Sequence, residues 1–241
     1  MTSVITQVSE RHWHALGDDQ VVGRGEVSRR PDGRSFVSID AWHDTVFDQI
    51  AGAMLANLPK PLYTVVDEQD LDLLSRWEGF GFGPRRREWE YVVPTDQSGS
   101  TPPGVTVLAV GKPDIEPLRE LDHVIRDEVE ATIGWHNMPA EVMSVLDPSR
   151  YAVAVHAGEY VGLVRVIPLP RQPRIGLIAV RASHRRRGIA RALLTGVLGA
   201  AHRRGVTTAS AEVNQSNQAA LALFEGIGGR RAGSNLELVL R

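Results

Sequence analysis

Apolar residues in the C-terminal half recur with two spacings, which alternate from one short segment to the next. Runs rich in β-branched residues predict strands, and apolar residues three and four positions apart predict amphipathic helices. The expected strands are 105–110, two within 151–169 joined around Ala157-Gly158-Glu159, 174–180, 207–213 and 235–241; the expected helices are 115–131, 190–205 and 217–229. The strands within 151–180 follow one another closely and should form an antiparallel meander.

The N-terminal half repeats the succession of elements expected over 174–241. It predicts a strand at 34–42, a helix at 43–58, a strand at 61–67, a helix at 71–82 and a strand at 87–93. Alternation of strands and helices is common, so chance competes with internal duplication as the explanation. The polar segment 95–104, rich in Pro, Gly and Ser, is typical of a linker. We therefore expect a mixed α/β (α+β) fold with two domains, 1–94 and 105–241.

Composition and charge exclude several classes of protein. The 241 residues include no cysteine, which removes disulfides, thiolate nucleophiles and cysteine-bound metal, and we expect no metal site. The net charge of −2 gives no global attraction to nucleic acid or to an anionic membrane. No apolar run approaches the ~20 residues that span a bilayer, and the N-terminus, with Glu10 and Asp18, does not resemble a signal peptide. We expect a cytoplasmic monomer or homodimer whose partner is a small molecule or a protein terminus.

The segment between Val180 and Leu194 carries the strongest candidate chemistry. It places Arg185, Gly188 and Ala190 in the spacing R-x-x-G-x-A, after a predicted strand and at the start of a predicted helix. A helix N-terminus offers unpaired backbone N–H groups and the positive end of the helix dipole, and small residues let an anion approach the main chain. Further positive charge comes from Arg186, Arg187 and Arg191. The spacing favours a phosphate-binding loop, although a solvated strand-to-helix turn has the same composition.

Two motifs, in order, resemble those of the GNAT superfamily of acyl-CoA transferases. The first is a strand, a Q/R-x-x-G-x-G/A loop and a helix, and Ile178-Ala179-Val180 followed by Arg185 to Ala190 reproduces it. The second, N-x-x-A-x-x-x-Y-x-x-x-G-F, is matched by Asn217, Ala220, Phe224, Gly228 and Gly229. The resemblance covers about 105–241. It implies a GNAT fold, with a mixed, mostly antiparallel sheet flanked by helices, in two tandem GNAT-like domains.

The resemblance also implies how the acyl donor, acetyl-CoA, would bind. The strand that ends at Val180 should separate from its neighbour, so that the pantetheine arm bonds to main-chain groups around Ile178 and Val180. Backbone amides of 186–191 would hold the pyrophosphate. Asn217 would contact the cofactor arm, although it also fits the N-cap of the following helix. The implied cofactor-binding residues are Ile178, Ala179, Val180, Arg185, Arg186, Arg187, Gly188, Ile189, Ala190, Arg191, Asn217 and Phe224.

Catalysis in this family is usually direct attack of the acceptor amine on the thioester, which needs a base for the ammonium and polarisation of the carbonyl. Phe224 stands where the family commonly has the tyrosine that protonates the leaving thiolate. A phenyl ring donates no proton, so the catalytic acid stays unassigned. The candidate bases are Glu212 and Glu128, followed by Glu130 and His156. A strand glutamate beside an apolar neighbour is also simply the solvent-facing member of the alternation.

Acidic residues cluster where the family builds its acceptor site, at Asp127, Glu128 and Glu130. If their side chains face the cleft, they would attract a cationic acceptor such as a polyamine or an aminoglycoside; otherwise they form a solvated helix face. Trp135-His136 nearby would wall the acceptor pocket or pack inside the domain.

The N-terminal half lacks the glycine loop, because His43-Asp44-Thr45 occupies its place. Asp44 partly neutralises a helix start that would otherwise attract pyrophosphate. We therefore expect 1–94 to be a degenerate GNAT-like domain without a cofactor, which covers the acceptor cleft of the catalytic domain 105–241.

The expected function is an N-acetyltransferase that modifies a primary amine of a small molecule, such as a cationic antibiotic or a polyamine. Acetylation of a protein N-terminus or lysine is the alternative within the same class, and would need an open groove for a peptide strand. A non-catalytic CoA-sensing module is the third, supported by Phe224. The net charge of −2 argues against a nucleic-acid protein that uses Arg185 to Arg187. The acceptor and the acyl-chain selectivity stay open.

Overall fold

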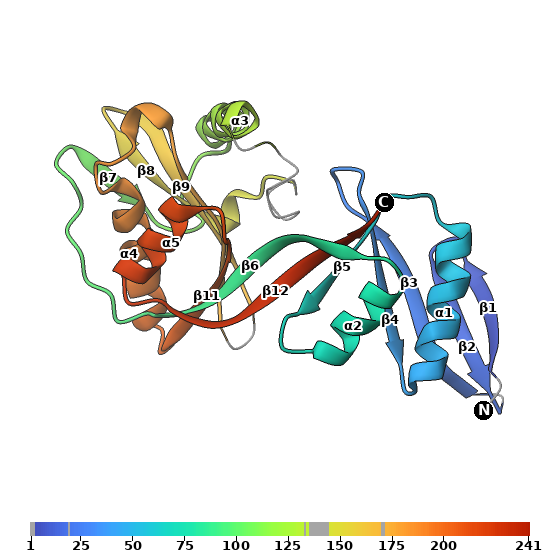
Figure 1. The fold of residues 1–241 in the computed structure, drawn as a ribbon. Helices are drawn as coiled ribbons and strands as arrows, with labels where there is room; N and C mark the ends of the chain where they lie inside the picture. Colours follow the sequence, from blue (N-terminus) through green and yellow to red (C-terminus); the bar gives the residue numbers. More distant parts are fainter. Residues whose placement is uncertain (1–2, 19, 133, 135–144, 170–171) are drawn as a thin grey trace. The chain divides into compact units, whose positions relative to one another are not determined.

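The computed structural model describes residues 3–18, 20–132, 134, 145–169 and 172–241 (Figure 1). Contacts divide the chain into two compact units. The N-terminal unit comprises the residues up to Arg87 together with Ser234–Arg241, and the C-terminal unit comprises Glu88–Gly233.

The N-terminal unit packs two helices on one face of its strands (Figure 1). Its elements are β1 (Val4–Ser9), β2 (His12–Gly17), β3 (Gln20–Arg29), β4 (Ser35–Ala41), α1 (Asp44–Asn57), β5 (Leu62–Asp67) and α2 (Leu71–Gly79). Neighbouring strands are antiparallel from β1 to β4, and β4 pairs with β5 in parallel. The core contains Trp13, Ile50 and Trp77. Gly23 lets α1 approach β3 closely, because a Cβ there would lie 2.7 Å from Cγ1 of Val46.

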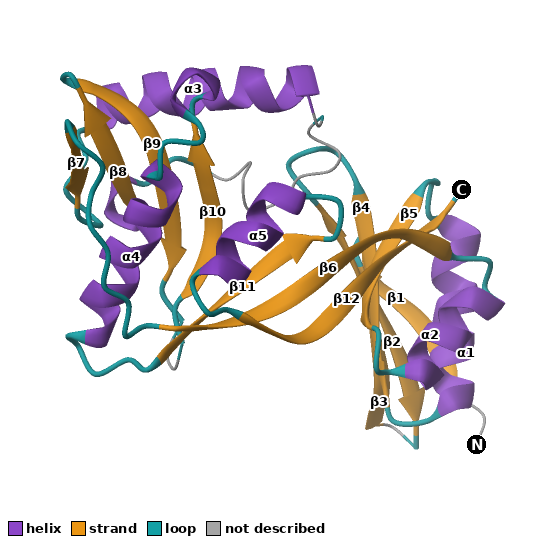
Figure 2. Ribbon diagram, turned by 60° about the vertical axis from the view of Figure 1, so that its left-hand side comes forward, coloured by secondary structure: helices purple, strands orange, loops and turns teal. Residues whose placement is uncertain are grey.

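The C-terminal unit has helices on both faces of its strands (Figure 2). Its elements are β7 (Val105–Leu108), α3 (Ile115–Thr132), β8 (Tyr151–His156), β9 (Glu159–Ile167), β10 (Arg174–Val180), α4 (Ile189–His202), β11 (Thr208–Asn214) and α5 (Gln218–Gly226). Strands β7 to β10 are successively antiparallel, and β10 pairs with β11 in parallel. Tyr151 and Val153 pack in the core with α3, whereas Ala152 and Ala154 pack in the core with α4 and α5. Alternate residues of one strand point to opposite faces, so α3 covers one face and α4 the other.

The mixed α/β fold and its mostly antiparallel sheet are confirmed, and each segment predicted as a strand or helix contains one. The turn expected between two strands lies at Ala157 and Gly158, which have φ angles of 50° and 83°. No strand was predicted before residue 34, where the structure has β1, β2 and β3. Strand β1 has no buried residue, so its sequence lacks the alternation that would predict it.

Two long strands run from one unit into the other, so the compact units differ from the predicted ranges 1–94 and 105–241. Strand β6 (Gly83–Pro94) begins in the N-terminal unit, but its Glu88–Pro94 segment pairs antiparallel with β11. Strand β12 (Arg230–Leu240) begins in the C-terminal unit, but its Asn235–Leu240 segment pairs antiparallel with β5. Each unit therefore gains a strand from the other half of the sequence. β6 pairs with β11 and β12 pairs with β5, so neither β5 nor β11 is an open edge.

The predicted linker 95–104 packs against the C-terminal unit. Thr95 is fully buried, its N–H donates to the carbonyl of Thr207 at 3.1 Å, and its hydroxyl donates to the carbonyl of Val206. A Cβ at Gly99 would lie 3.0 Å from the hydroxyl oxygen of Thr195 in α4. The segment is irregular in backbone structure but is held at several points along its length.

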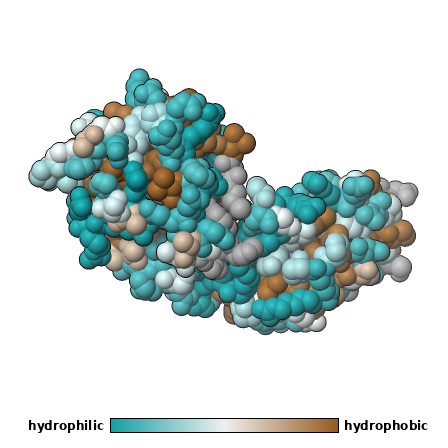
Figure 3. Space-filling model, turned by 90° about the horizontal axis from the view of Figure 1, so that it is seen from above, coloured by the Kyte–Doolittle hydropathy of each residue, from teal (hydrophilic) through white to brown (hydrophobic). Residues whose placement is uncertain are grey.

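The visible surface mixes hydrophilic residues with scattered apolar ones (Figure 3). Within the described residues, no helix combines the length and apolar character needed to cross a membrane.

Candidate functional site

Strands β10 and β11 separate soon after they begin. They pair only at Arg174 with Ser210 and at Ile175 with Ala211 in the described residues, whereas β10 stays paired with β9 as far as Val180. The main chain of β10 beyond Ile175 therefore has no strand partner on the β11 side. This is the separation implied for a strand that binds an extended ligand arm, and the predicted residues Ile178, Ala179 and Val180 lie along it.

The connection from β10 to α4 forms a loop whose backbone suits an anion. Residues 181–188 include a short 3₁₀ turn, and Arg186 and Gly188 have φ angles of 64° and 81°. Gly188 is the N-cap of α4 and provides no side-chain cap. The first N–H groups of α4, from Ile189 onward, thus have no intrahelical acceptor and point outward at the positive end of the helix dipole. Ile189 itself is buried in the core and anchors the turn.

The loop arginines have different orientations. Arg185 points back along β10, donating from Nε to the carbonyl of Val180 at 2.9 Å. Arg191 donates to the carbonyl of Gly226 at 2.7 Å, at the end of α5. Arg186 and Arg187 are exposed, and within the described part of the chain they form no ion pair. Arg186 and Arg187 are therefore the arginines left available to a phosphate.

Glu128, a predicted candidate base, contacts the loop. Its two carboxylate oxygens accept from the N–H of Ala182, each at 2.9 Å, and Oε2 also accepts from Arg185 at 2.7 Å. These donors occupy the carboxylate that a base would direct at the acceptor amine. The other members of the predicted acidic cluster, Asp127 and Glu130, are exposed on α3. Trp135-His136 lie outside the described residues.

One histidine, His184, lies within the same loop, and another, His156, lies beside it. The rings of His156 and His184 are 5.4 Å apart between centroids. Burial, followed by the positive charge of Arg187 and then by His156 and Arg181, lowers the pKa of His184. His156, the last of the candidate bases, thus lies next to the 181–188 loop.

Glu212, the other main candidate base, lies on β11 near the point where β10 and β11 separate. It accepts from Arg174 at 2.7 Å. Its neighbours Ala211 and Val213 pack in the core with α4, so Glu212 points to the opposite face, which α3 covers in part. The register also places Glu90 of β6 directly opposite Glu212. Sequence reasoning missed Glu90, because residue 90 precedes the predicted linker and its pairing with β11 is not a local signal.

Asn217 and Phe224 both have structural partners. The side chain of Asn217 accepts from the N–H of Ala220 at 3.1 Å and caps α5. Phe224 is buried, and its ring packs 5.8 Å from that of Tyr91. The Tyr91 hydroxyl donates to Glu225 at 2.9 Å and accepts from Arg231 at 3.1 Å, and burial raises the pKa of Tyr91. The hydroxyl proton of Tyr91 is therefore directed at Glu225.

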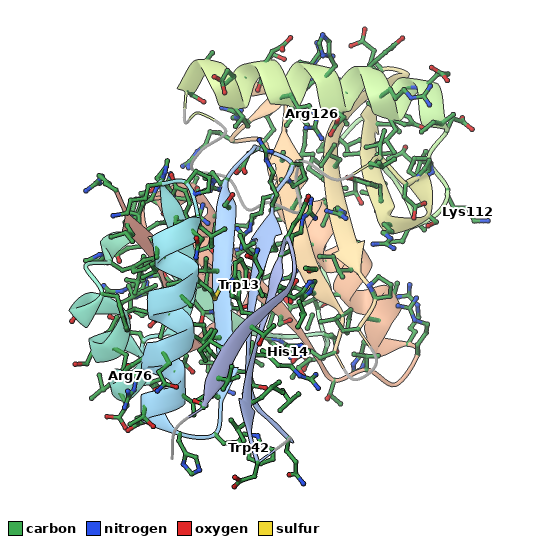
Figure 4. All side chains as sticks on the ribbon, turned by 90° about the vertical axis from the view of Figure 1, so that its right-hand side faces the viewer. Trp13, His14, Trp42, Arg76, Lys112 and Arg126 are labelled. Atoms are coloured by element: carbon green, nitrogen blue, oxygen red, sulfur yellow. The ribbon has the colours of Figure 1, made fainter. Side chains whose placement is uncertain are left out.

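The corresponding place in the N-terminal unit has no such loop. Only Trp42 and His43 lie between β4 and α1, and β4 pairs with β5 at two positions, Ser35 with Leu62 and Phe36 with Tyr63. Asp44 in the first turn of α1 forms an ion pair with Arg76 of α2; Arg76 is labelled in Figure 4. The strand separation is repeated, but the connection to the following helix is shorter than the one between β10 and α4.

Separated parallel strands, a helix N-terminus without a side-chain cap and exposed arginines are the features expected of a site for a phosphate-bearing cofactor with an extended arm. Residues 118–228 match the family model of the acetyltransferase (GNAT) family. This part of the chain is therefore a GNAT acetyltransferase domain, and its acyl donor is acetyl-CoA. The residues fit that donor, because Gly188 leaves the main chain accessible and the β11 side of β10 is unpaired.

Solved structures share the fold over nearly the whole chain. A GCN5-related N-acetyltransferase from Sphaerobacter thermophilus is 20% identical, with a TM-score of 0.68, over 98% of this chain and 82% of that one. A tandem GNAT protein from the clavulanic acid biosynthesis pathway is 15% identical, with a TM-score of 0.68, over 95% and 82%. A GCN5-related glucosamine N-acetyltransferase region of a fungal multi-domain β-N-acetylglucosaminidase is 13% identical, with a TM-score of 0.69, over 94% and 32%. No curated protein sequence matches the chain. The tandem GNAT-like arrangement expected from the sequence is consistent with these neighbours.

Proposed function

We propose that the C-terminal unit transfers an acetyl group from acetyl-CoA to a primary amine of a small molecule, by direct attack in a ternary complex. The observation that carries this proposal is the separation of β10 from β11 beside the glycine-capped start of α4. The N-terminal unit, with Trp42 and His43 in place of the loop, binds no cofactor in this proposal and has a structural role.

Each part of the C-terminal unit has a defined task in this proposal. Backbone N–H groups of 186–191, with the side chains of Arg186 and Arg187, hold the negative pyrophosphate. The unpaired main chain of β10 aligns the cofactor arm as an added strand would. Phe224 contributes apolar surface that excludes water from the arm. Acetyl-CoA supplies the activated thioester carbonyl.

The acceptor side is where Glu212 and Glu90 lie opposite one another. Carboxylates attract an ammonium group, and Glu212 is the residue proposed to take its proton. The leaving thiolate needs no strong acid, since an ordinary thiol has a pKa of about 8.5. A small cationic acceptor also agrees with the fungal structural neighbour, which is a glucosamine N-acetyltransferase region.

The test is release of free thiol from acetyl-CoA in the presence of aminoglycosides, polyamines, amino sugars or N-terminal peptides. Gly188→Trp should abolish turnover, because a side chain at a φ of 81° blocks the anion site. Gly33→Trp is the matched control, since Gly33 has a φ of 83° and open space around it in the N-terminal unit. Turnover with peptides alone would favour the protein acetyltransferase alternative. Cofactor binding without turnover on any acceptor would favour the CoA-sensing alternative.

A further inference from the structure

The carboxylate of Glu128 joins three parts of the C-terminal unit that are distant in sequence. It projects from the last turns of α3 and accepts the N–H of Ala182, at the start of the 3₁₀ turn, with both oxygens at 2.9 Å. Arg185 donates to it at 2.7 Å and to the carbonyl of Val180 at 2.9 Å. A closed set of hydrogen bonds thus runs from α3 to the 3₁₀ turn, to Arg185 and to the end of β10.

The position of this set of bonds matters because the loop conformation is unusual. Arg186 has a φ of 64°, in the left-handed region, and is not a glycine. Such a conformation persists only where surrounding contacts hold it. Glu128 and Arg185 fix the residues immediately before Arg186, and buried Ile189 fixes those after it. The loop is therefore held at both ends, with Arg186 to Gly188 between them.

The Glu128 carboxylate forms an ion pair with Arg185, but it also lies close to the proposed anion site. A negative charge close to an anion site weakens anion binding, unless the charge does something that outweighs the repulsion. Side-chain exposure of Glu128 is 22%, so water only partly screens it. The N-terminal unit has neither the loop nor a helix between β1 and β2 that could carry an equivalent residue. The α3 carboxylate of Glu128 thus lies in the same unit as the 181–188 loop, which is proposed to bind phosphate.

We propose that Glu128 is a positioning residue that holds the 181–188 loop in its cofactor-binding conformation, rather than a base. This inference rests on the proposed function, in that the loop is taken to bind the pyrophosphate of acetyl-CoA. Two opposed effects follow from removing the charge. Loss of positioning weakens cofactor binding, whereas loss of repulsion alone strengthens it, so the sign of the change identifies the role.

The experiment compares Glu128→Gln with Glu120→Gln, which removes the same charge from an exposed position nearer the start of α3. Calorimetry with CoA should give a dissociation constant at least about tenfold weaker for Glu128→Gln, as expected when charge-assisted hydrogen bonds are lost, and unchanged for Glu120→Gln. The KM for acetyl-CoA should rise more than kcat falls. A kcat that collapses with an unchanged dissociation constant would overturn the proposal in favour of a base, and tighter binding would overturn it in favour of simple repulsion.

Amide exchange in the protein without cofactor separates this inference from the proposed function. Peptides covering 181–188 should exchange faster in Glu128→Gln than in the wild type, while peptides from α4 and β9 stay protected and show that the unit is folded. Glu128→Asp, which keeps the charge but shortens the side chain, should give an intermediate rate. If the wild type binds no CoA, the proposed function fails, and the exchange data still decide whether Glu128 holds the loop. Equal exchange in all three proteins would overturn the inference.

Discussion

At the scale of single residues, side chains around the site are mostly bound to partners that the motif itself does not include. Arg185, the first residue of the motif, bonds to Glu128 and to the carbonyl of Val180. Asn217 caps α5, and Phe224 packs on Tyr91. The groups that we propose to bind the phosphate are therefore the backbone N–H groups and the side chains of Arg186 and Arg187. The motif describes the backbone of a phosphate site more faithfully than the roles of its side chains.

Replacing Tyr91 with phenylalanine should lower stability by about 1 kcal/mol, because the hydroxyl loses two hydrogen bonds whose partners, Glu225 and Arg231, are partly exposed and regain water. The kcat should stay within about threefold of the wild type, since the hydroxyl donates to Glu225 and not to the cofactor site. Urea unfolding and steady-state kinetics measure the two effects. A hundredfold loss of kcat would show that Tyr91 is the missing acid.

His184, within the 181–188 loop, gives a pH-dependent prediction. The pKa of His184 is lowered from about 6.5 by burial and next by Arg187. A group with a depressed folded pKa favours folding above its unfolded pKa of about 6.5, and that contribution is lost as pH falls below this value. Arg187→Gln should raise the pKa of His184, which two-dimensional NMR of the imidazole nitrogens measures. Arg204→Gln, just beyond the C-terminal end of α4, should leave it unchanged.

At the scale of elements, local signals predicted the β10–loop–α4 unit well. Strand, glycine and helix are adjacent in sequence, and Gly188, with a φ angle of 81°, lies where the motif has its glycine. The contact between Glu128 and Ala182 joins residues far apart in sequence, and no periodicity encodes it. Strand β1 was not predicted, because none of its residues is buried. The features that the sequence did not predict depend on tertiary contacts.

The segment 95–104 offers an element-scale test, because its polar composition resembles a linker while its structure is packed. Thr95→Val should destabilise the C-terminal unit by about 1–3 kcal/mol, since it leaves the carbonyl of Val206 without the hydroxyl that donates to it in a buried site. Ser98→Ala, at an exposed position in the same segment, should change stability by less than about 0.5 kcal/mol. Thermal unfolding compares the two variants. Equal effects would show that the segment behaves as a free linker.

At the scale of the whole molecule, the two halves of the sequence do not correspond to the two compact units. Leu236, Leu238 and Leu240 of β12 are buried in the core of the N-terminal unit, with Trp13 and Trp77. The pairing of β12 with β5 could not be predicted from the hydrophobic pattern, because any strand with a matching alternation of apolar and polar residues could pair with β5. The last residues of the chain therefore stabilise a unit that begins near its first residues.

Leu238→Ala tests this exchange directly. Leu238 is fully buried, so the variant should lose about 2–5 kcal/mol from the lost transfer energy and the remaining cavity. Because the cavity lies in the core of the N-terminal unit, amide exchange should rise in β2, α1 and β5, which are distant in sequence, while α4 stays protected. Leu221→Ala, in the core of the C-terminal unit, should give the reverse pattern. If Leu238→Ala instead deprotected α4 and left α1 unchanged, β12 would belong with the C-terminal unit along its whole length, and 1–94 would be a self-contained domain as its sequence suggests.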